Sequence, residues 1–228
     1  MFSFKQYVNE MSFHTPIMKS SRGLESKEFS DRYDKFVEEL VKWAKEANKI
    51  CWKYKTEKLI WRGVKIKGGK YGVVILANNK DRESYMGKIL PQVKEHIDNL
   101  KDRFHIGIPV FTIKNKNLAG LFGSAMVFLP KDNYRCLWST NVSDSAHLKV
   151  KDLTDELYHT YHERENSLPT GDFNGEIIFD CDEYYLVDVF KLLTDTKSNK
   201  ELQTYEDLAK LLYHWIQKTL FRQKQSYK

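Results

Sequence analysis

"LIWRGVKIKGGKYGVVIL", residues 59–76, is an apolar stretch with one permanently charged arginine inside it, Arg62, which Gly63 follows. Two runs of strand composition, "LIWRGVKI" and "YGVVILA", flank "KGGK", where Gly68 and Gly69 suit the positive φ of a hairpin turn. The stretch therefore predicts two strands joined as a hairpin. It leaves open why a guanidinium stands within a strand that is otherwise apolar.

The surrounding sequence predicts a mixture of helices and strands. Helical spacing of apolar residues occurs in 27–54, 84–104 (with Pro91 at a first turn or kink), 150–166 and 204–224, and a short helix is predicted in 117–123. At the start of the last helix, Thr204 suits an N-cap and Asp207 the third helical position. Strands are predicted in 108–113, 125–130, 134–139 and 175–190, the last as two strands around a solvated acidic hairpin tip, 180–183. A long helix followed mostly by strands indicates an α+β fold.

The composition of the 228 residues is that of a folded globule, because hydrophobic residues make up 41% and aromatic residues 14%. The net charge of +6 is spread along the chain, which argues against a dedicated nucleic-acid groove. Three cysteines without a C-x-x-C pair indicate neither a disulfide framework nor a zinc site. No apolar run has the roughly 18 residues that a membrane span needs. We expect a soluble intracellular protein.

Arg62 has two readings. If Arg62 stands at a strand edge, the aliphatic part of its side chain would pack on the sheet and its guanidinium would be solvated. Alternatively, it would face a cleft and bind a phosphate or carboxylate with both arms of the guanidinium, while Gly63 lets a ligand approach the backbone.

Two further stretches carry candidate site residues. Glu176 opens the strand "EIIF" directly after the glycine-containing loop "TGDFNG", and it is either an exposed carboxylate or a catalytic one. In "PVFTIKNKNLAGLFG", residues 109–123, the Thr112 hydroxyl could position that glutamate, and an aromatic ring, Phe111 or Phe122, could stack on a flat ligand. The alternative is that both phenylalanines belong to the hydrophobic core.

In chain order, "LIWRG", "PVFTIKNKNLAGLFG", "VFLPKDNYRCLWSTNVSD" and "NGEIIFDCDEYYLVDV" resemble the ADP-ribosyltransferases of arginine-serine-glutamate type. More narrowly, they resemble a family of proteins of tailed, T4-like bacteriophages, and the resemblance covers roughly residues 58–190. It implies a split β-sandwich with N-terminal and C-terminal helices, formed by one domain over residues 27–228.

The resemblance also implies an activity and a set of site residues. The activity is mono-ADP-ribosyl transfer from NAD, used as a substrate and without a metal, to a host protein or nucleic acid. Glu176 would be the catalytic acid residue, with Arg62 on a phosphate or the ribose of NAD and Thr112 at the hydroxyl position. Gly63 would contact the nicotinamide carboxamide. We expect Arg62 and Glu176 to share one cleft.

Two departures from that family bear on the activity. The usual Ser-Thr-Ser run is here Phe111-Thr112-Ile113, which leaves the register of the hydroxyl open by one position. The usual glutamate two residues before the catalytic one is here Asn174. Because that acid helps to activate an arginine acceptor, its absence indicates either another acceptor or a non-enzymatic phage virion or internal head protein that keeps the fold.

The first 26 residues are predicted to be a leader and linker. "MFSFKQYVNEM" resembles N-terminal segments that direct proteins into the phage prohead and are cut after a glutamate, here Glu10. The alternative is a plain amphipathic N-terminus. Packaging would bring the protein into the host cytoplasm with the phage genome, and no membrane partner is expected.

"HTYHERE" places His159 and His162 three residues apart with Glu163 beside them. The spacing matches no H-E-x-x-H signature, so no metal site is predicted there.

Overall fold

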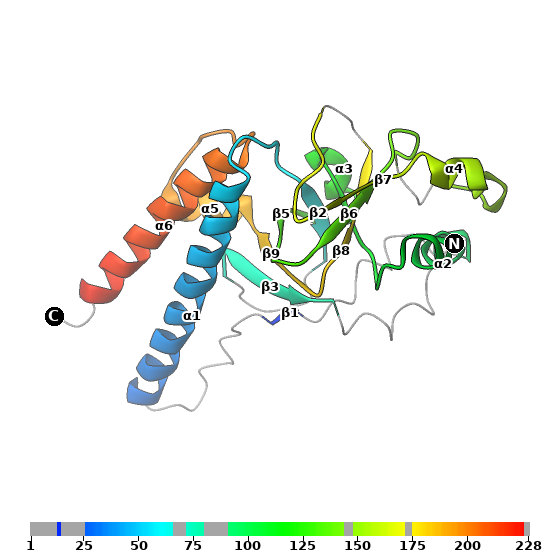
Figure 1. Cartoon of the computed structure of the whole chain (residues 1–228). Coiled ribbons are helices and arrows are strands. Elements are labelled where there is room, and N and C mark those ends of the chain that lie inside the picture. Colours follow the sequence, from blue (N-terminus) through cyan, green and yellow to red (C-terminus); the bar gives the residue numbers. More distant parts are fainter. Residues whose placement is uncertain are drawn as a thin grey trace.

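The computed structural model describes residues 13–14, 26–65, 72–79, 91–143, 148–171 and 175–225, which form an α+β fold. The helices are α1 (Ser26–Lys53), α2 (Pro91–Phe104), α3 (Lys116–Gly120), α4 (Asp155–His159), α5 (Val189–Thr196) and α6 (Tyr205–Gln225), with a 3₁₀ turn η4 (Val150–Asp152). The strands are β1 (Phe13–His14), β2 (Trp61–Val64), β3 (Val74–Asn78), β4 (Val110–Ile113), β5 (Ser124–Pro130), β6 (Arg135–Trp138), β7 (His162–Glu165), β8 (Glu176–Asp180) and β9 (Glu183–Val187). The strands lie between α1, α5 and α6 on one side and α2 and α4 on the other (Figure 1).

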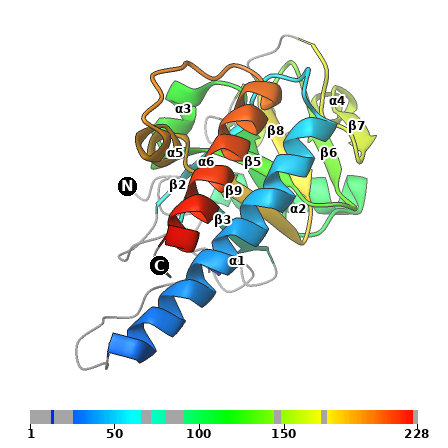
Figure 2. The ribbon, with the colours of Figure 1, turned by 90° about the vertical axis from the view of Figure 1, so that its left-hand side faces the viewer.

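The N-terminal and C-terminal helices pack along each other, as both ribbon views show (Figures 1 and 2). Ala44, Ala47 and Cys51 of α1 are fully buried at helical spacing, and small side chains there let a neighbouring helix come close. The Asn48 amide of α1 donates a hydrogen bond to the Ala209 carbonyl of α6. The predicted helix 27–54 is confirmed.

Thr204 and Asp207 form the predicted cap of α6. The Thr204 hydroxyl accepts a hydrogen bond from the Asp207 amide at 3.3 Å, and the Asp207 carboxylate accepts one from the Thr204 amide at 3.3 Å. Two backbone donors at the helix start are satisfied reciprocally in this way.

The sheet is antiparallel, with strand order β1-β3-β9-β5-β2-β4-β8-β6-β7, in which β1 adds two residues at one edge to the eight strands β2–β9. At its centre β2 and β4 share a single register pair, Trp61 with Ile113. By contrast, β2 pairs with β5, and β4 pairs with β8, over four residues each. The sheet therefore consists of two halves, β1-β3-β9-β5-β2 and β4-β8-β6-β7, joined at one place.

The two halves fold toward each other around an aromatic core. The rings of Phe128 in β5 and Phe179 in β8 lie 4.6 Å apart, although β2 and β4 stand between their strands in the sheet. In a flat sheet three strand spacings would separate them by about 14 Å. Tyr184 lies 4.8 Å from Phe128, and Tyr134 lies 5.6 Å from Phe179. The face that carries these rings is the inner face of the fold.

A second apolar cluster covers the outer face of the half β4-β8-β6. Phe111, Ile178 and Leu137 form one row across these three strands, because each is paired with the next. The α2 residues Val93, Ile97 and Leu100 and the α4 residue Tyr158 pack on this row. This second cluster is separate from the main core of the molecule.

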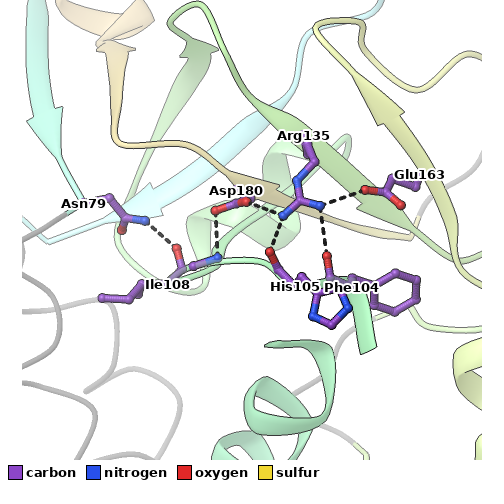
Figure 3. A network of polar contacts seen from close by, with 8 residues as sticks. Asn79, Phe104, His105, Ile108, Arg135, Glu163 and Asp180 are labelled. Carbon is purple, nitrogen blue, oxygen red and sulfur yellow. Dashed lines mark hydrogen bonds and ion pairs between the residues drawn. The ribbon is translucent and has the colours of Figure 1, made fainter. Parts of the chain in front are cut away.

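A polar network fixes the end of α2 to this half of the sheet (Figure 3). The Arg135 guanidinium donates to two carbonyls at the end of α2 and pairs with Asp180 at 3.0 Å and Glu163 at 3.3 Å. The Asp180 carboxylate also accepts from the Gly107 amide at 3.0 Å. The side chain of Asn79 donates to the same loop. Asp180 thus belongs to an internal clamp and not to a solvated hairpin tip, which corrects the sequence interpretation.

The predicted strands of 59–76 and 175–190 exist, but neither pair forms a hairpin. β2 lies between β5 and β4, whereas β3 lies between β1 and β9; β8 and β9 even belong to different halves of the sheet. These strands are largely buried, so their composition identifies them as strands without indicating their neighbours. Gly68 and Gly69 lie outside the described residues.

The predicted helix 150–166 is wrong beyond residue 159. Only α4 and the turn η4 are helical, and the next segment, "HERE", is strand β7, which pairs with β6 over four residues. This segment has no apolar residue, so its sequence shows no period, and pairing with the exposed edge of β6 decides its structure.

Of the predicted helix 84–104, the structure describes α2 over Pro91–Phe104, and residues 84–90 lie outside the described part. One element boundary differs from the sequence interpretation. The strand predicted to reach residue 190 ends at Val187, and α5 follows. Asp188 is its N-cap and accepts a hydrogen bond from the Lys191 amide.

The aromatic core predicts a large loss of stability for Phe179→Ala, of about 3–5 kcal/mol, because a fully buried ring is removed. Phe190→Ala on α5 is the matched control, since that ring is 82% exposed, and it should change stability by no more than about 0.5 kcal/mol. Urea unfolding of both variants measures the difference. Equal losses for the two variants would contradict the assignment of the inner face.

Candidate functional site

The three predicted catalytic residues lie on three neighbouring strands at the centre of the sheet. Arg62 is on β2, Thr112 on β4 and Glu176 at the start of β8. All three side chains are buried, with 3%, 4% and 6% of their surfaces exposed. Residues from positions as distant as 62 and 176 in the chain are therefore brought close together.

The strand register assigns these side chains to two faces of the sheet. Trp61 pairs with Ile113, and Ile113 pairs with Glu176, so these three residues form one row. Neighbouring residues of a strand point to opposite faces. The Glu176 side chain therefore points to the outer face, whereas Arg62 and Thr112, each one residue along its strand from that row, point to the inner face.

The guanidinium of Arg62 is buried in the inner face and not solvated at a strand edge. Its Nη1 donates a hydrogen bond of 2.8 Å to the Phe111 carbonyl, and its Cζ lies 5.8 Å from the centre of the Tyr184 ring. The bond spans the place where β2 and β4 separate. Arg62 thus continues the connection between the halves of the sheet beyond their single register pair.

Thr112 also makes a bond within the sheet. Its hydroxyl donates to the carbonyl of Ile177 at 2.9 Å, in the residue that follows Glu176. Thr112 therefore contacts the backbone of the strand that carries the glutamate, on the face opposite to the carboxylate.

Gly63 lies on the outer face beneath α3. A Cβ atom at this position would come within 2.1 Å of the Ala119 carbonyl oxygen and 2.7 Å of the Phe122 Cβ. Only glycine lets α3 pack this closely on β2. Phe122 in turn packs against the second apolar cluster, to which Phe111 belongs.

The six predicted site residues thus form two groups. Arg62 and Thr112 belong to the inner face, and the outer face carries Gly63, Phe111, Phe122 and Glu176. Asn174 lies outside the described residues.

Three polar residues that were not singled out from the sequence, Tyr161, His96 and Tyr158, form a chain on the side of the sheet to which Glu176 points. Tyr161 packs against the second cluster, and burial together with the Glu176 charge raises the pKa of its hydroxyl well above the ordinary value. The Tyr161 hydroxyl lies 3.3 Å from Nε2 of His96, and Nδ1 of His96 lies 3.0 Å from the Tyr158 hydroxyl. A buried polar chain therefore leads from α2 to Tyr161, on whose hydroxyl the Glu176 charge acts.

His96 is completely buried at the centre of this chain, and burial lowers its pKa to about 4. At neutral pH the imidazole is uncharged, with one nitrogen as donor and the other as acceptor. In the sequence, His96 stands between Val93 and Ile97 at core positions of a helix, so its spacing indicated a buried residue but no partner.

The histidines considered for a metal point away from this chain. His159 and His162 are exposed, and the ring of His162 stacks on Trp138 with 5.4 Å between centroids. Within the described segments no group of three or more His, Cys, Asp or Glu side chains could hold a metal ion.

No family model, curated protein or solved structure matches the chain. The resemblance drawn from the motifs therefore stays a prediction. No helix in the described part of the chain is long and apolar enough to cross a membrane.

The buried His96 predicts a loss of stability in acid. The unfolded chain binds a proton near pH 6.5, whereas the folded chain holds His96 neutral down to about pH 4. Its contribution is thus complete above pH 6.5 and falls by up to about 1.4 kcal/mol per pH unit between pH 6.5 and 4. Urea unfolding at pH 7 and pH 4.5 should show a smaller loss in His96→Gln than in the wild type.

The control is His214→Gln, at an exposed position of α6, which should keep the wild-type pH dependence. If His96→Gln and the wild type lose the same stability in acid, His96 does not titrate in this way.

Proposed function

We propose that the protein is a mono-ADP-ribosyltransferase that transfers ADP-ribose from NAD to a host macromolecule during phage infection. The observation that carries the proposal is a buried glutamate, Glu176, at the start of a central strand, next to the strand of Thr112 and one strand further from Arg62. The two half-sheets and the paired terminal helices support the finer fold assignment, an ADP-ribosyltransferase-like split β-sandwich.

The chemistry requires a carboxylate. When the bond between nicotinamide and ribose breaks, its electron pair leaves with nicotinamide, and the ribose becomes an oxocarbenium-like cation. A nucleophilic atom of the acceptor then bonds to the same carbon and loses its proton. A carboxylate that is fixed in a site with little water stabilises the developing positive charge more strongly than it could in solution. Glu176 is the candidate for this role.

The outer face carries aromatic rings on the same side as that carboxylate. Phe122 and Phe111 belong to the cluster that adjoins Glu176, and the half-buried Phe122 has ring surface that could stack on nicotinamide. Gly63 brings α3 and its Phe122 close to β2. Arg62 would reach a phosphate only after exchanging its bond with the Phe111 carbonyl, so its role in NAD binding entails a local rearrangement.

A second function is favoured by a specific observation. Arg62 and Thr112 both make hydrogen bonds within the sheet, on the face opposite to Glu176. This is the arrangement expected of a non-enzymatic phage virion or internal head protein that keeps the fold without turnover. The packaging segment that this role shares with the enzyme, residues 1–10, lies outside the described residues.

The test is NAD turnover by the full chain. With labelled NAD and host lysate, we expect transfer of label to protein or nucleic acid, and Glu176→Gln should reduce NAD hydrolysis and transfer about 10²–10³-fold, because charge stabilisation in the transition state is lost. Glu165→Gln is the matched control, since that carboxylate is exposed on β7.

Undiminished turnover in Glu176→Gln would exclude the catalytic role of this residue. A wild-type chain that neither hydrolyses NAD nor binds it in calorimetry, but is incorporated into virions, would establish the non-enzymatic function instead.

A further inference from the structure

The chain of His96, Tyr158 and Tyr161 is a buried polar feature to which the proposed reaction gives no task. Both ring nitrogens of His96 have a tyrosine hydroxyl as neighbour, at 3.0 and 3.3 Å. The His96 ring also stacks on Tyr158, with 5.7 Å between centroids. Since a neutral imidazole donates through one nitrogen and accepts through the other, it can hold both hydroxyls at once.

Other hydrogen bonds fix the backbone around Tyr161. The Ser139 and Thr160 hydroxyls lie 2.6 Å apart, and the Tyr161 amide donates to the Tyr158 carbonyl at 3.2 Å. In the segment after β6, which begins with Ser139, the Val142 carbonyl accepts a hydrogen bond of 3.3 Å from the Glu176 amide. Glu176 and Thr160, the residue before Tyr161, are therefore attached to the same short segment.

The position of α2, and with it His96, is set from two directions. Arg103 near the end of α2 pairs with Asp155 of α4, and its guanidinium lies 4.7 Å from the centre of the Tyr158 ring. The clamp of Arg135 holds the loop after α2 on β6 and β8. His96 is thus part of a rigid layer above the strand that begins with Glu176.

We infer that Tyr161, held by His96, is a positioning residue that fixes the orientation of the Glu176 carboxylate. The inference rests on the proposed function for its catalytic meaning, but the structural relation between the two side chains does not. Trp138 of β6 pairs with both His162 and Ile177, so Tyr161 and Glu176 adjoin this row on the two sides of β6 and share the outer face. The Glu176 charge also acts on the Tyr161 hydroxyl. A polar hydroxyl beside a buried carboxylate lowers the free energy of the charged form.

The test uses the full chain and has two readouts. In Tyr161→Phe, the titration midpoint of the Glu176 carboxyl carbon, followed by NMR with ¹³C-labelled glutamate, should move to higher pH. The kcat for NAD hydrolysis should fall about tenfold with little change in KM, since the lost interaction orients the carboxylate and does not bind NAD. Tyr213→Phe, at a position that is 58% exposed on α6, should change neither quantity.

His96→Gln provides the second variant, because an amide also has a donor and an acceptor, and it should cause a smaller shift than Tyr161→Phe. An unchanged Glu176 titration in Tyr161→Phe would overturn the inference; if that variant does not fold, an unchanged titration in His96→Gln decides in the same way. A shifted titration in a protein whose wild type does not hydrolyse NAD would refute the proposed function and leave the positioning of Glu176 standing.

Discussion

The single register pair between Trp61 and Ile113 is the constraint on which the rest of the structure depends. Because β2 and β4 separate on leaving this pair, each half of the sheet can turn about it, and the rings of Phe128 and Phe179 can meet. Arg62 connects the halves a second time through a charge-assisted bond to a backbone carbonyl. A charged side chain is suited to this task because it reaches across a gap that the backbone no longer closes.

Two surfaces of different character result. The inner face is filled with aromatic rings, whereas the outer face of β4 and β8 carries a carboxylate, a phenol and a neutral imidazole beneath a helical layer. Burial acts on these groups in opposite senses: it raises the pKa of Tyr161 and lowers that of His96. Both shifts favour the uncharged forms of these two side chains.

The helices at both chain ends and most strands could be predicted from the sequence, because periodicity and caps such as Thr204 are local signals. Strand neighbours could not, since the partners of β2 and β9 are far away in the chain and their composition fits many arrangements. The motifs singled out Glu176, Thr112 and Arg62, which lie on the neighbouring strands β8, β4 and β2, yet the face of each side chain depends on register, which one residue reverses. His96 escaped notice because its role comes from two tyrosines more than 60 positions away.

Strand β7 gives the edge of the sheet a property that is independent of the proposed catalysis. Its four residues, His162–Glu165, are all exposed and polar, and the charges of Glu163, Arg164 and Glu165 alternate in sign along one edge of the sheet. An unpaired strand edge is a template on which another chain can add a strand, and charged side chains that must be desolvated oppose such growth. The end of the sheet thus discourages its extension into aggregates, which matters most at the high local concentrations of a crowded compartment.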